Sequence, residues 1–211
     1  GVFRSADLAF ALNNQEQNSN ASRVRPNVGL CFIDYFRTME PSATRHTAYI
    51  GAIKRLVERN REQCDFSIVI LQEGIGQRDD WLLEIFDKQK FQVMHVTSME
   101  EATMLAASVD ALVVTRYHLA ILGARWRKPV VVIDHERKMG ELADELALPS
   151  VTLERFLTED IDLEWFTRPF DPSNTLRRCE KQEHLVDINF AWLDEIALPP
   201  TNSTEPVAGP R

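Results

Sequence analysis

An arginine and a histidine directly follow a short apolar run that predicts a buried strand. The run at 111–114 is Ala-Leu-Val-Val, and Arg116 and His118 come next, where an apolar helical pattern begins. A helix N-terminus offers N–H groups and partial positive charge, and a guanidinium matches a carboxylate or phosphate with parallel hydrogen bonds. We therefore predict an anion site at Arg116 and His118. The alternative is that Arg116 pairs with a nearby acid and His118 has a structural role.

Two other predicted strands also end in residues that could bind an anion. His135 and Lys138 follow the run Pro-Val-Val-Val-Ile at 129–133, and Arg37 follows the strand predicted at 28–33. In an open parallel sheet, ligands bind beyond the carboxyl ends of the strands. We expect His135 and Lys138 to border the same pocket as Arg116. The alternatives are an ordinary charged helix start for the first pair and a polar loop for Arg37.

Short apolar runs alternate with helical patterns along most of the chain, and this organisation must position those residues. Several runs are apolar throughout, which predicts a parallel sheet buried on both faces. The fold class is therefore α/β, a Rossmann-like parallel sheet with helices on both faces. Ser98 with Glu101 predicts a capping box at one helix start. The predicted strands are 28–33, 66–71, 91–96, 111–114, 129–133 and 150–152, and the predicted helices are 49–57, 81–86, 98–107, 117–126 and 139–146.

Composition changes along the chain mark its expected parts. Residues 1–27 contain the tail of a strand and a polar linker rich in Asn, Gln and Ser. Residues 28–170 form the Rossmann-like domain. A longer helix is expected within 171–198, and 199–211, with Pro, Thr, Ser and Gly, is expected to be a disordered tail.

The charge and cysteine content exclude several classes of function. The 211 residues carry a formal net charge of -8, so we expect no nucleic-acid partner. No apolar run approaches the roughly 18–20 residues of a membrane span, and there is no secretory signal, so a cytoplasmic location is expected. The three cysteines are far apart and predict buried reduced thiols, and no Cys/His spacing predicts a metal site. The chain begins with Gly rather than Met, so we expect a piece of something longer.

Residues 111–124 resemble the strand-Arg-x-His-helix signature of the polysaccharide pyruvyl transferase family. The similarity covers about residues 5–150. It implies a two-domain fold like that of GT-B glycosyltransferases, of which this chain would hold the C-terminal, donor-binding half. The other segments that resemble the family are 6–12, 98–101, 106–110, 128–133, Lys138 and 142–148.

The resemblance implies phosphoenolpyruvate as the donor and a sugar diol of a polysaccharide or glycan precursor as the acceptor. That precursor could be lipid-linked at a membrane surface. Arg116 and His118 would bind the donor, with Lys138 as a further contact. Transfer needs a proton on the methylene carbon of phosphoenolpyruvate, and His118 is the candidate acid. Fixed cations would hold the departing phosphate, and the scheme needs no metal or other cofactor.

The chain departs from the family pattern at several positions, and two other functions stay open. Tyr117 stands where the family has a small or aliphatic residue, and Asp-His-Glu at 134–136 replaces an aromatic-led segment. A GT-B glycosyltransferase using a nucleotide-sugar would need a carboxylate for the ribose and a Gly-rich loop at the diphosphate. Residues 72–76 contain two glycines but lack the spacing of a phosphate loop. The third possibility is a Rossmann-like binding module without activity.

Overall fold

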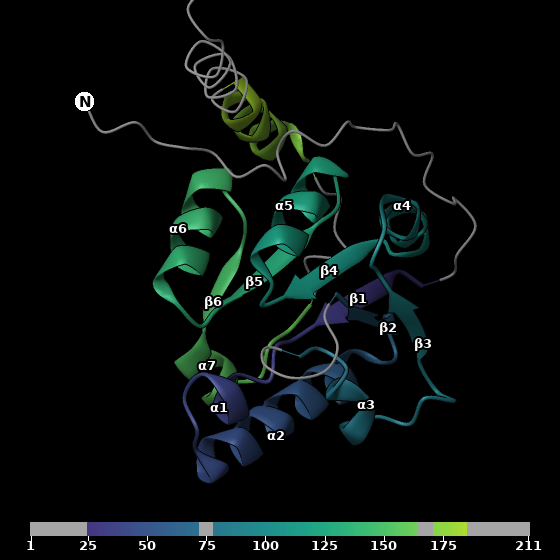
Figure 1. The fold of residues 1–211 in the computed structure, drawn as a ribbon, viewed down its shortest axis with the longest axis vertical. Helices are drawn as coiled ribbons and strands as arrows, with labels where there is room; N and C mark the ends of the chain where they lie inside the picture. Colours follow the sequence, from purple (N-terminus) through teal and green to yellow (C-terminus); the bar gives the residue numbers. More distant parts are fainter. Residues whose placement is uncertain (1–24, 72–77, 164–170, 185–211) are drawn as a thin grey trace, which may run out of the picture.

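In the part of the chain that the structure describes, six parallel strands form one sheet in the order β3-β2-β1-β4-β5-β6 (Figure 1). The computed structural model describes residues 25–71, 78–163 and 171–184. Every neighbouring pair of strands is parallel, which confirms the predicted Rossmann-like sheet. The strands are β1 (Asn27–Cys31), β2 (Asp65–Ile70), β3 (Gln92–His95), β4 (Ala111–Val114), β5 (Val130–Asp134) and β6 (Ser150–Thr152).

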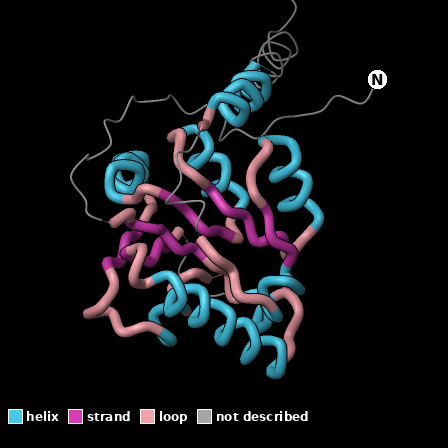
Figure 2. The backbone as a smooth tube through the Cα atoms, turned by 180° about the vertical axis from the view of Figure 1, so that it is seen from behind, coloured by secondary structure: helices cyan, strands magenta, loops and turns pink. Residues whose placement is uncertain are grey.

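Helices cover both faces of the sheet, as Figures 1 and 2 show from opposite sides. One face is covered by α1 (Tyr35–Thr38), α2 (Ala43–Asn60), α3 (Leu82–Ile85) and α7 (Leu153–Thr158). Residues of these helices pack in one hydrophobic cluster with Phe32. The other face is covered by α4 (Met99–Ser108), α5 (Tyr117–Arg125) and α6 (Arg137–Leu146), whose residues pack in a second cluster with Cys31.

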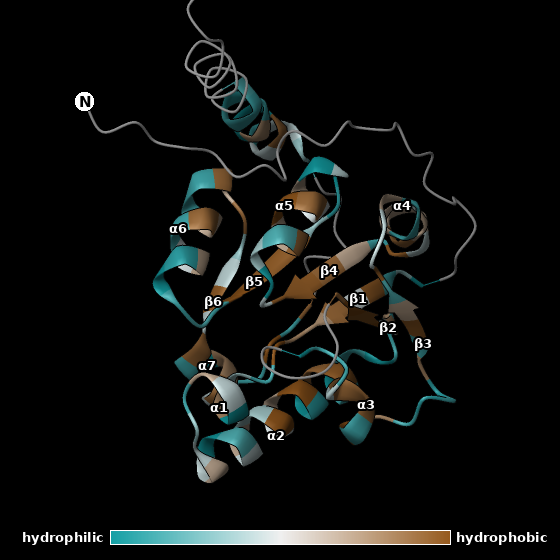
Figure 3. Ribbon diagram, in the orientation of Figure 1, coloured by the Kyte–Doolittle hydropathy of each residue, from teal (hydrophilic) through white to brown (hydrophobic). Residues whose placement is uncertain are grey.

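The central strands are apolar at nearly every position because both of their faces are buried. In β4, Ala111 and Val113 belong to the cluster on the α2 face, whereas Leu112 and Val114 belong to the cluster on the α5 face. Side chains of a strand alternate between the two faces of a sheet, so each face receives an apolar residue. Figure 3 shows the hydrophobic colour concentrated in these strands.

A glycine allows α5 to approach the sheet closely. A Cβ atom added at Gly123 would lie 2.6 Å from both Leu112 Cδ1 and Val130 Cγ2, nearer than real Cβ contacts. Those two side chains stand on β4 and β5. The helix that begins at Arg116 is therefore seated directly on the two strands whose ends carry most of the predicted site.

The predicted capping box is confirmed, and two short helices were not predicted. Ser98 and Glu101 form the expected capping box, and Ser42 caps α2. The four-residue α1 lies in what was expected to be a polar loop after the first strand, and α7 follows β6 directly. Both are too short for the 3.6-residue periodicity to be visible in the sequence.

Residues 173–184 are helical and pack against the ends of α5 and α6. Arg125 of α5 pairs with Glu183, and Arg178 Nη1 donates to the carbonyl oxygens of Asp144 and Glu145 at 2.8 and 3.0 Å. The predicted strand tail in 1–27, the end of the helix expected within 171–198, and the tail at 199–211 lie outside the described residues. In the described part of the chain, no helix meets the length and hydropathy of a membrane span.

Candidate functional site

The two halves of the sheet meet at β1 and β4, and this is where a ligand site is expected. From β1 the chain proceeds to β2 and β3 on one side, then returns to β4, β5 and β6 on the other. In parallel sheets of this order, ligands bind at such a reversal, outside the carboxyl ends of the strands. Residues 32–34 follow β1 and residues 115–118 follow β4. The predicted Arg116 and His118 therefore flank this switch point.

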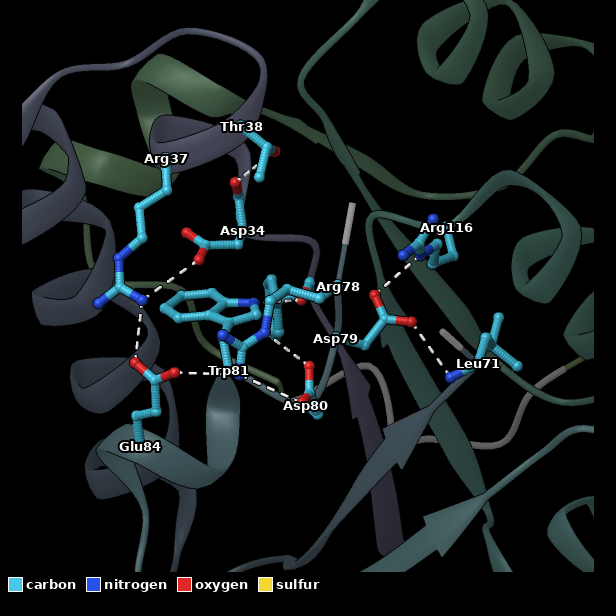
Figure 4. A network of polar contacts seen from close by, with 11 residues as sticks. Asp34, Arg37, Thr38, Leu71, Arg78, Asp79, Asp80, Trp81, Glu84 and Arg116 are labelled. Carbon is cyan, nitrogen blue, oxygen red and sulfur yellow. Dashed lines mark hydrogen bonds and ion pairs between the residues drawn. The ribbon is translucent and has the colours of Figure 1, made fainter. Parts of the chain in front are cut away.

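Arg116 is held at the switch point by a buried aspartate, as Figure 4 shows. Its Nε donates to Asp79 Oδ1 at 2.8 Å, while Leu71 N donates to Asp79 Oδ2 at 3.1 Å. Asp79 is fully buried and the Arg116 side chain is 15% exposed. Arg116 thus has the acidic partner that the alternative interpretation expected, and it keeps its place at the N-cap of α5.

The segment that contains Asp79 is hydrogen-bonded to the residues after β1. Trp81 Nε1 donates to the Phe32 carbonyl oxygen at 2.7 Å, and Asp34 N donates to the Arg78 carbonyl oxygen at 3.2 Å. Trp81 is completely buried. Residues 78–81 therefore lie against the residues that follow β1.

Arg37, the third predicted cation, also lies near this edge, within a network of ion pairs (Figure 4). Its Nη1 is 2.9 Å from Glu84 Oε2 and 3.4 Å from Asp34 Oδ2. Arg78 pairs with Asp80 at 2.7 Å and with Glu84 at 3.0 Å. The hydrogen bond from Arg37 is the main cause that lowers the pKa of Glu84 below its ordinary value.

Beside this network, Asp34 and His46 form a buried pair of titratable groups. Asp34 Oδ1 lies 3.5 Å from His46 Nδ1, and the side chains are 2% and 12% exposed. Within the described residues neither atom has a hydrogen-bond partner. Burial raises the pKa of Asp34, and the charges of Arg37 and His46 oppose that rise. The His46 ring also contacts Trp81, with centroids 5.6 Å apart.

The other predicted site residues stand at the ends of β4 and β5. His118 is exposed in the first turn of α5, and its ring lies edge-on to Tyr117. Lys138 is 60% exposed and its Nζ lies 3.0 Å from Glu136 Oε1. The His135 side chain is only 2% exposed. Its burial lowers the pKa, so it is neutral at neutral pH.

The edge of the sheet therefore carries both signs of charge. Three predicted cations each have a carboxylate neighbour: Asp79 for Arg116, Glu84 with Asp34 for Arg37, and Glu136 for Lys138. His135 connects the end of β5 with α1. Its ring centroid lies 5.1 Å from that of Tyr35 in α1, and its Nε2 lies 3.5 Å from Glu136 Oε1. A common ligand for Arg116, His118 and Lys138 stays a prediction.

Sequence reasoning missed Asp79, Asp34 and His46. Asp79-Asp80-Trp81 follows the second strand and precedes a helix, so the rule used for Arg116 would have included it. The neighbouring Gly-containing segment at 72–76 lies outside the described residues. His46 has no such signal, because it lies inside α2 and only the fold brings it to Asp34.

Neither a metal cluster nor the hollow described below adds a group to this edge within the residues that the structure describes. In the described ranges, no three His, Cys, Asp or Glu side chains are arranged to hold a metal ion. An open hollow of about 580 Å³ lies at the amino end of β2, on the edge opposite the switch point. It is lined by residues of α2 and of the segment before β3, among them Lys54, Arg61, Phe86 and Phe91.

Comparison with known families finds none whose model matches this chain, and no curated protein is similar to it. Several solved structures are similar at low identity. TarM shares 14% identity over 88% of this chain and 38% of its own, with a TM-score of 0.47. The glycosyltransferase of kitacinnamycin shares 12% over 89% and 48%, with a TM-score of 0.46. The glycosyltransferase SnogD from Streptomyces nogalater shares 14% over 85% and 45%, with a TM-score of 0.46.

This chain spans 38–48% of the length of those three structures. At such identities and TM-scores the similarity carries no argument about activity. The functional interpretation therefore rests on the residues at the switch point.

Proposed function

We propose that this chain is the donor-binding half of a two-domain transferase, and that its donor is a nucleotide-sugar bound at the switch point. The observation that carries the proposal is the Arg116 guanidinium, held at the carboxyl end of β4 and the start of α5 by buried Asp79. A helix start with an oriented guanidinium suits a diphosphate. The strand order is that of nucleotide-binding sheets, which is an argument by analogy of fold.

The mixture of charges supports a nucleotide-sugar over a smaller anion. Phosphoenolpyruvate is compact and carries both a carboxylate and a phosphate, so its site needs several cations facing one small volume. Here Arg37, Arg116 and Lys138 each have a carboxylate nearby. A nucleotide-sugar carries many hydroxyl groups besides its diphosphate, and carboxylates accept hydrogen bonds from hydroxyls. Glu136, 32% exposed at the end of β5, is the candidate acceptor for a ribose hydroxyl.

Pyruvyl transfer from phosphoenolpyruvate is the second candidate, and the observation that favours it is the position of His118. This histidine is exposed in the first turn of α5, two residues after Arg116. A general acid must reach the donor, and under this candidate His118 would do so from that position. The resemblance of residues 111–124 to the pyruvyl transferase signature supports the same role. Under either candidate the acceptor would be a saccharide, bound mainly by the other half of the enzyme.

Calorimetric titration of the chain with uridine diphosphate and, separately, with phosphoenolpyruvate tests the proposal. We expect uridine diphosphate to bind, and Arg116→Ala to weaken it by about 2–4 kcal/mol, because a charged contact to a desolvated anion is lost. Arg137→Ala is the matched control, since Arg137 is 90% exposed on the neighbouring α6. The affinity of Arg137→Ala for uridine diphosphate should equal that of the wild type.

The same titrations separate the alternatives. Binding of phosphoenolpyruvate alone, weakened by both Arg116→Ala and His118→Ala, would favour pyruvyl transfer. Binding of neither anion would reject both transferase candidates and favour a binding module without activity. Arg116→Lys serves as a second variant, because it keeps the positive charge near Asp79 if Arg116→Ala does not fold.

A further inference from the structure

Asp79 lies where two strands that are not neighbours come to an end. Its Oδ2 accepts from Leu71 N, one residue past β2, and its Oδ1 accepts from Arg116 Nε, two residues past β4. In the sheet, β1 stands between these two strands. The Asp79 carboxylate therefore bridges the end of β1, at the switch point itself (Figure 4).

The backbone around Asp79 is anchored on both sides. The residue before it, Arg78, accepts a hydrogen bond from Asp34 N, and Trp81, two residues after it, donates to Phe32. Trp81 is fully buried and stacks on Tyr49, with ring centroids 5.7 Å apart. The carboxylate consequently has a fixed position from which it can orient a partner.

The pairing with Asp79 gives the Arg116 guanidinium a defined orientation. Asp79 is removed from solvent, so its charge must be compensated by a close cation, and Arg116 Nε supplies one at 2.8 Å. The guanidinium is planar, and a bond at Nε fixes the plane that the terminal nitrogens share. An arginine oriented before a ligand arrives loses less conformational entropy when the ligand binds.

We propose that Asp79 is a positioning residue, which holds Arg116 in the orientation that contacts the phosphorylated donor. This inference rests on the proposed function, in which Arg116 binds that donor. A carboxylate suits the two contacts described here, because Leu71 N–H and Arg116 Nε–H are both donors and each bonds to a different oxygen of Asp79. An asparagine has one acceptor oxygen and an NH2 group, so it can satisfy only one of the two.

The charge of Asp79 has the opposite effect on an anion, which makes the direction of the change informative. A carboxylate next to Arg116 repels a bound phosphate, so removal of the charge alone would strengthen binding. Loss of the orientation would weaken it. Asp79→Asn removes the charge and one hydrogen bond with little change of shape, and therefore distinguishes the two roles.

A double-mutant cycle on the 211-residue chain, with uridine diphosphate as the probe, tests the inference. We expect Asp79→Asn to weaken binding about tenfold, and the double variant with Arg116→Ala to bind no more weakly than Arg116→Ala alone. Asp110→Asn is the matched control, because Asp110 accepts from Asn27 N at the opposite edge of the sheet. Unchanged or tighter binding by Asp79→Asn would overturn the inference.

Nuclear magnetic resonance of the arginine Nε–H groups supplies a measurement that does not depend on a ligand. We expect the Arg116 order parameter to approach the value of rigid backbone, about 0.85, and to fall in Asp79→Asn. Arg137 is the reference, since its Nε also donates to a carboxylate, that of Glu141, but on the exposed surface. Equal mobility of Arg116 and Arg137 in the wild type would overturn the inference even if uridine diphosphate binds.

The two measurements also separate this inference from the proposed function. A rigid, Asp79-dependent Arg116 in a chain that binds neither uridine diphosphate nor phosphoenolpyruvate would reject the proposed function and keep the orientation by Asp79. If Asp79→Asn does not fold, Arg116→Lys replaces it, because lysine keeps the charge and lacks Nε. We expect it to weaken binding about tenfold, and unchanged affinity would count against the inference.

Discussion

The buried charge of Asp34, just after β1, destabilises the folded state. Its carboxylate is 2% exposed, and the nearest basic side chains are at long distances, 3.4 Å for Arg37 and 3.5 Å for His46. Burial disfavours the charged form and raises the pKa above the ordinary 3.8. Because the folded protein holds this proton more tightly than the unfolded chain, Asp34 stabilises the fold fully only below its ordinary pKa. That contribution is lost as the pH rises through the raised value.

We therefore predict that Asp34→Asn raises the melting temperature at pH 7, because the amide removes the buried charge. The gain should shrink as the pH falls toward 4, where the wild-type carboxyl becomes protonated in the folded state. Thermal unfolding between pH 4 and pH 7 measures this. Asp160→Asn is the matched control, because it alters a carboxylate that is 53% exposed and so removes no buried charge. A lower melting temperature for Asp34→Asn at pH 7 would mean that the ion pairs outweigh the burial.

At the scale of elements, close contact between α5 and the sheet depends on one residue. Gly123 leaves no room for a methyl group between the helix and the side chains of Leu112 and Val130. Gly51 of α2 offers a contrast, since the nearest atom to its added Cβ is Arg55 Nη1 at 3.5 Å, the end of a flexible side chain. The two glycines occupy helices of opposite faces and differ in the space available.

Gly123→Ala should destabilise the protein by about 1–3 kcal/mol, because the added methyl overpacks the interface. Gly51→Ala should instead stabilise it by about 0.5–1 kcal/mol, because alanine is the better helix former. Urea unfolding of the two variants, each against the wild type, gives both free energies. Equal effects of the two substitutions would show that α5 does not sit as tightly as described.

The sequence predicts this sheet well because a strand buried on both faces is apolar at nearly every position. Runs such as 111–114 and 129–133 are apolar on both faces, and caps such as Ser98 with Glu101 mark helix starts. The strands at 28–33, 66–71 and 91–96 also lie within two residues of β1, β2 and β3. The four residues of α1 give no periodic signal, so that helix was missed.

The site was less predictable, for a different physical reason. Residues at strand ends are marked by position, so Arg116, His118 and Arg37 could be placed at the carboxyl edge. Their partners are set by distant parts of the chain: Asp79 lies 37 residues from Arg116, and Glu84 lies 47 from Arg37. The residue types therefore predict basic side chains that could bind an anion, and only the fold shows that each of them meets a carboxylate.

At the scale of the whole molecule, the helix at 173–184 encloses part of the second hydrophobic cluster. Cys179 in this helix is 2% exposed, and burial raises its pKa to about 11. Arg125 of α5 is nearly buried beneath it and pairs with Glu183. The reactivity of Cys179 therefore reports whether this helix stays attached.

We predict that Cys179 resists alkylation at pH 7.5, because a thiol of pKa about 11 is almost entirely protonated there and the sulfur is buried. Arg125→Ala should increase its rate of modification at least about tenfold, since loss of the ion pair loosens the helix. Mass spectrometry of iodoacetamide-treated protein measures each site. Cys31 and Cys64, both buried in the sheet domain, should stay protected in both proteins and serve as internal references.

The position of β1 in the sheet has a consequence for synthesis on the ribosome. Val28 of β1 pairs with Phe66 on one side and with Ala111 on the other. The edge of β1 that pairs with β4 therefore stays unpaired while about 80 further residues are translated. An unpaired apolar edge of this kind is prone to pair with other chains. The switch point between these two strands is therefore completed late, only after β4 has emerged from the ribosome.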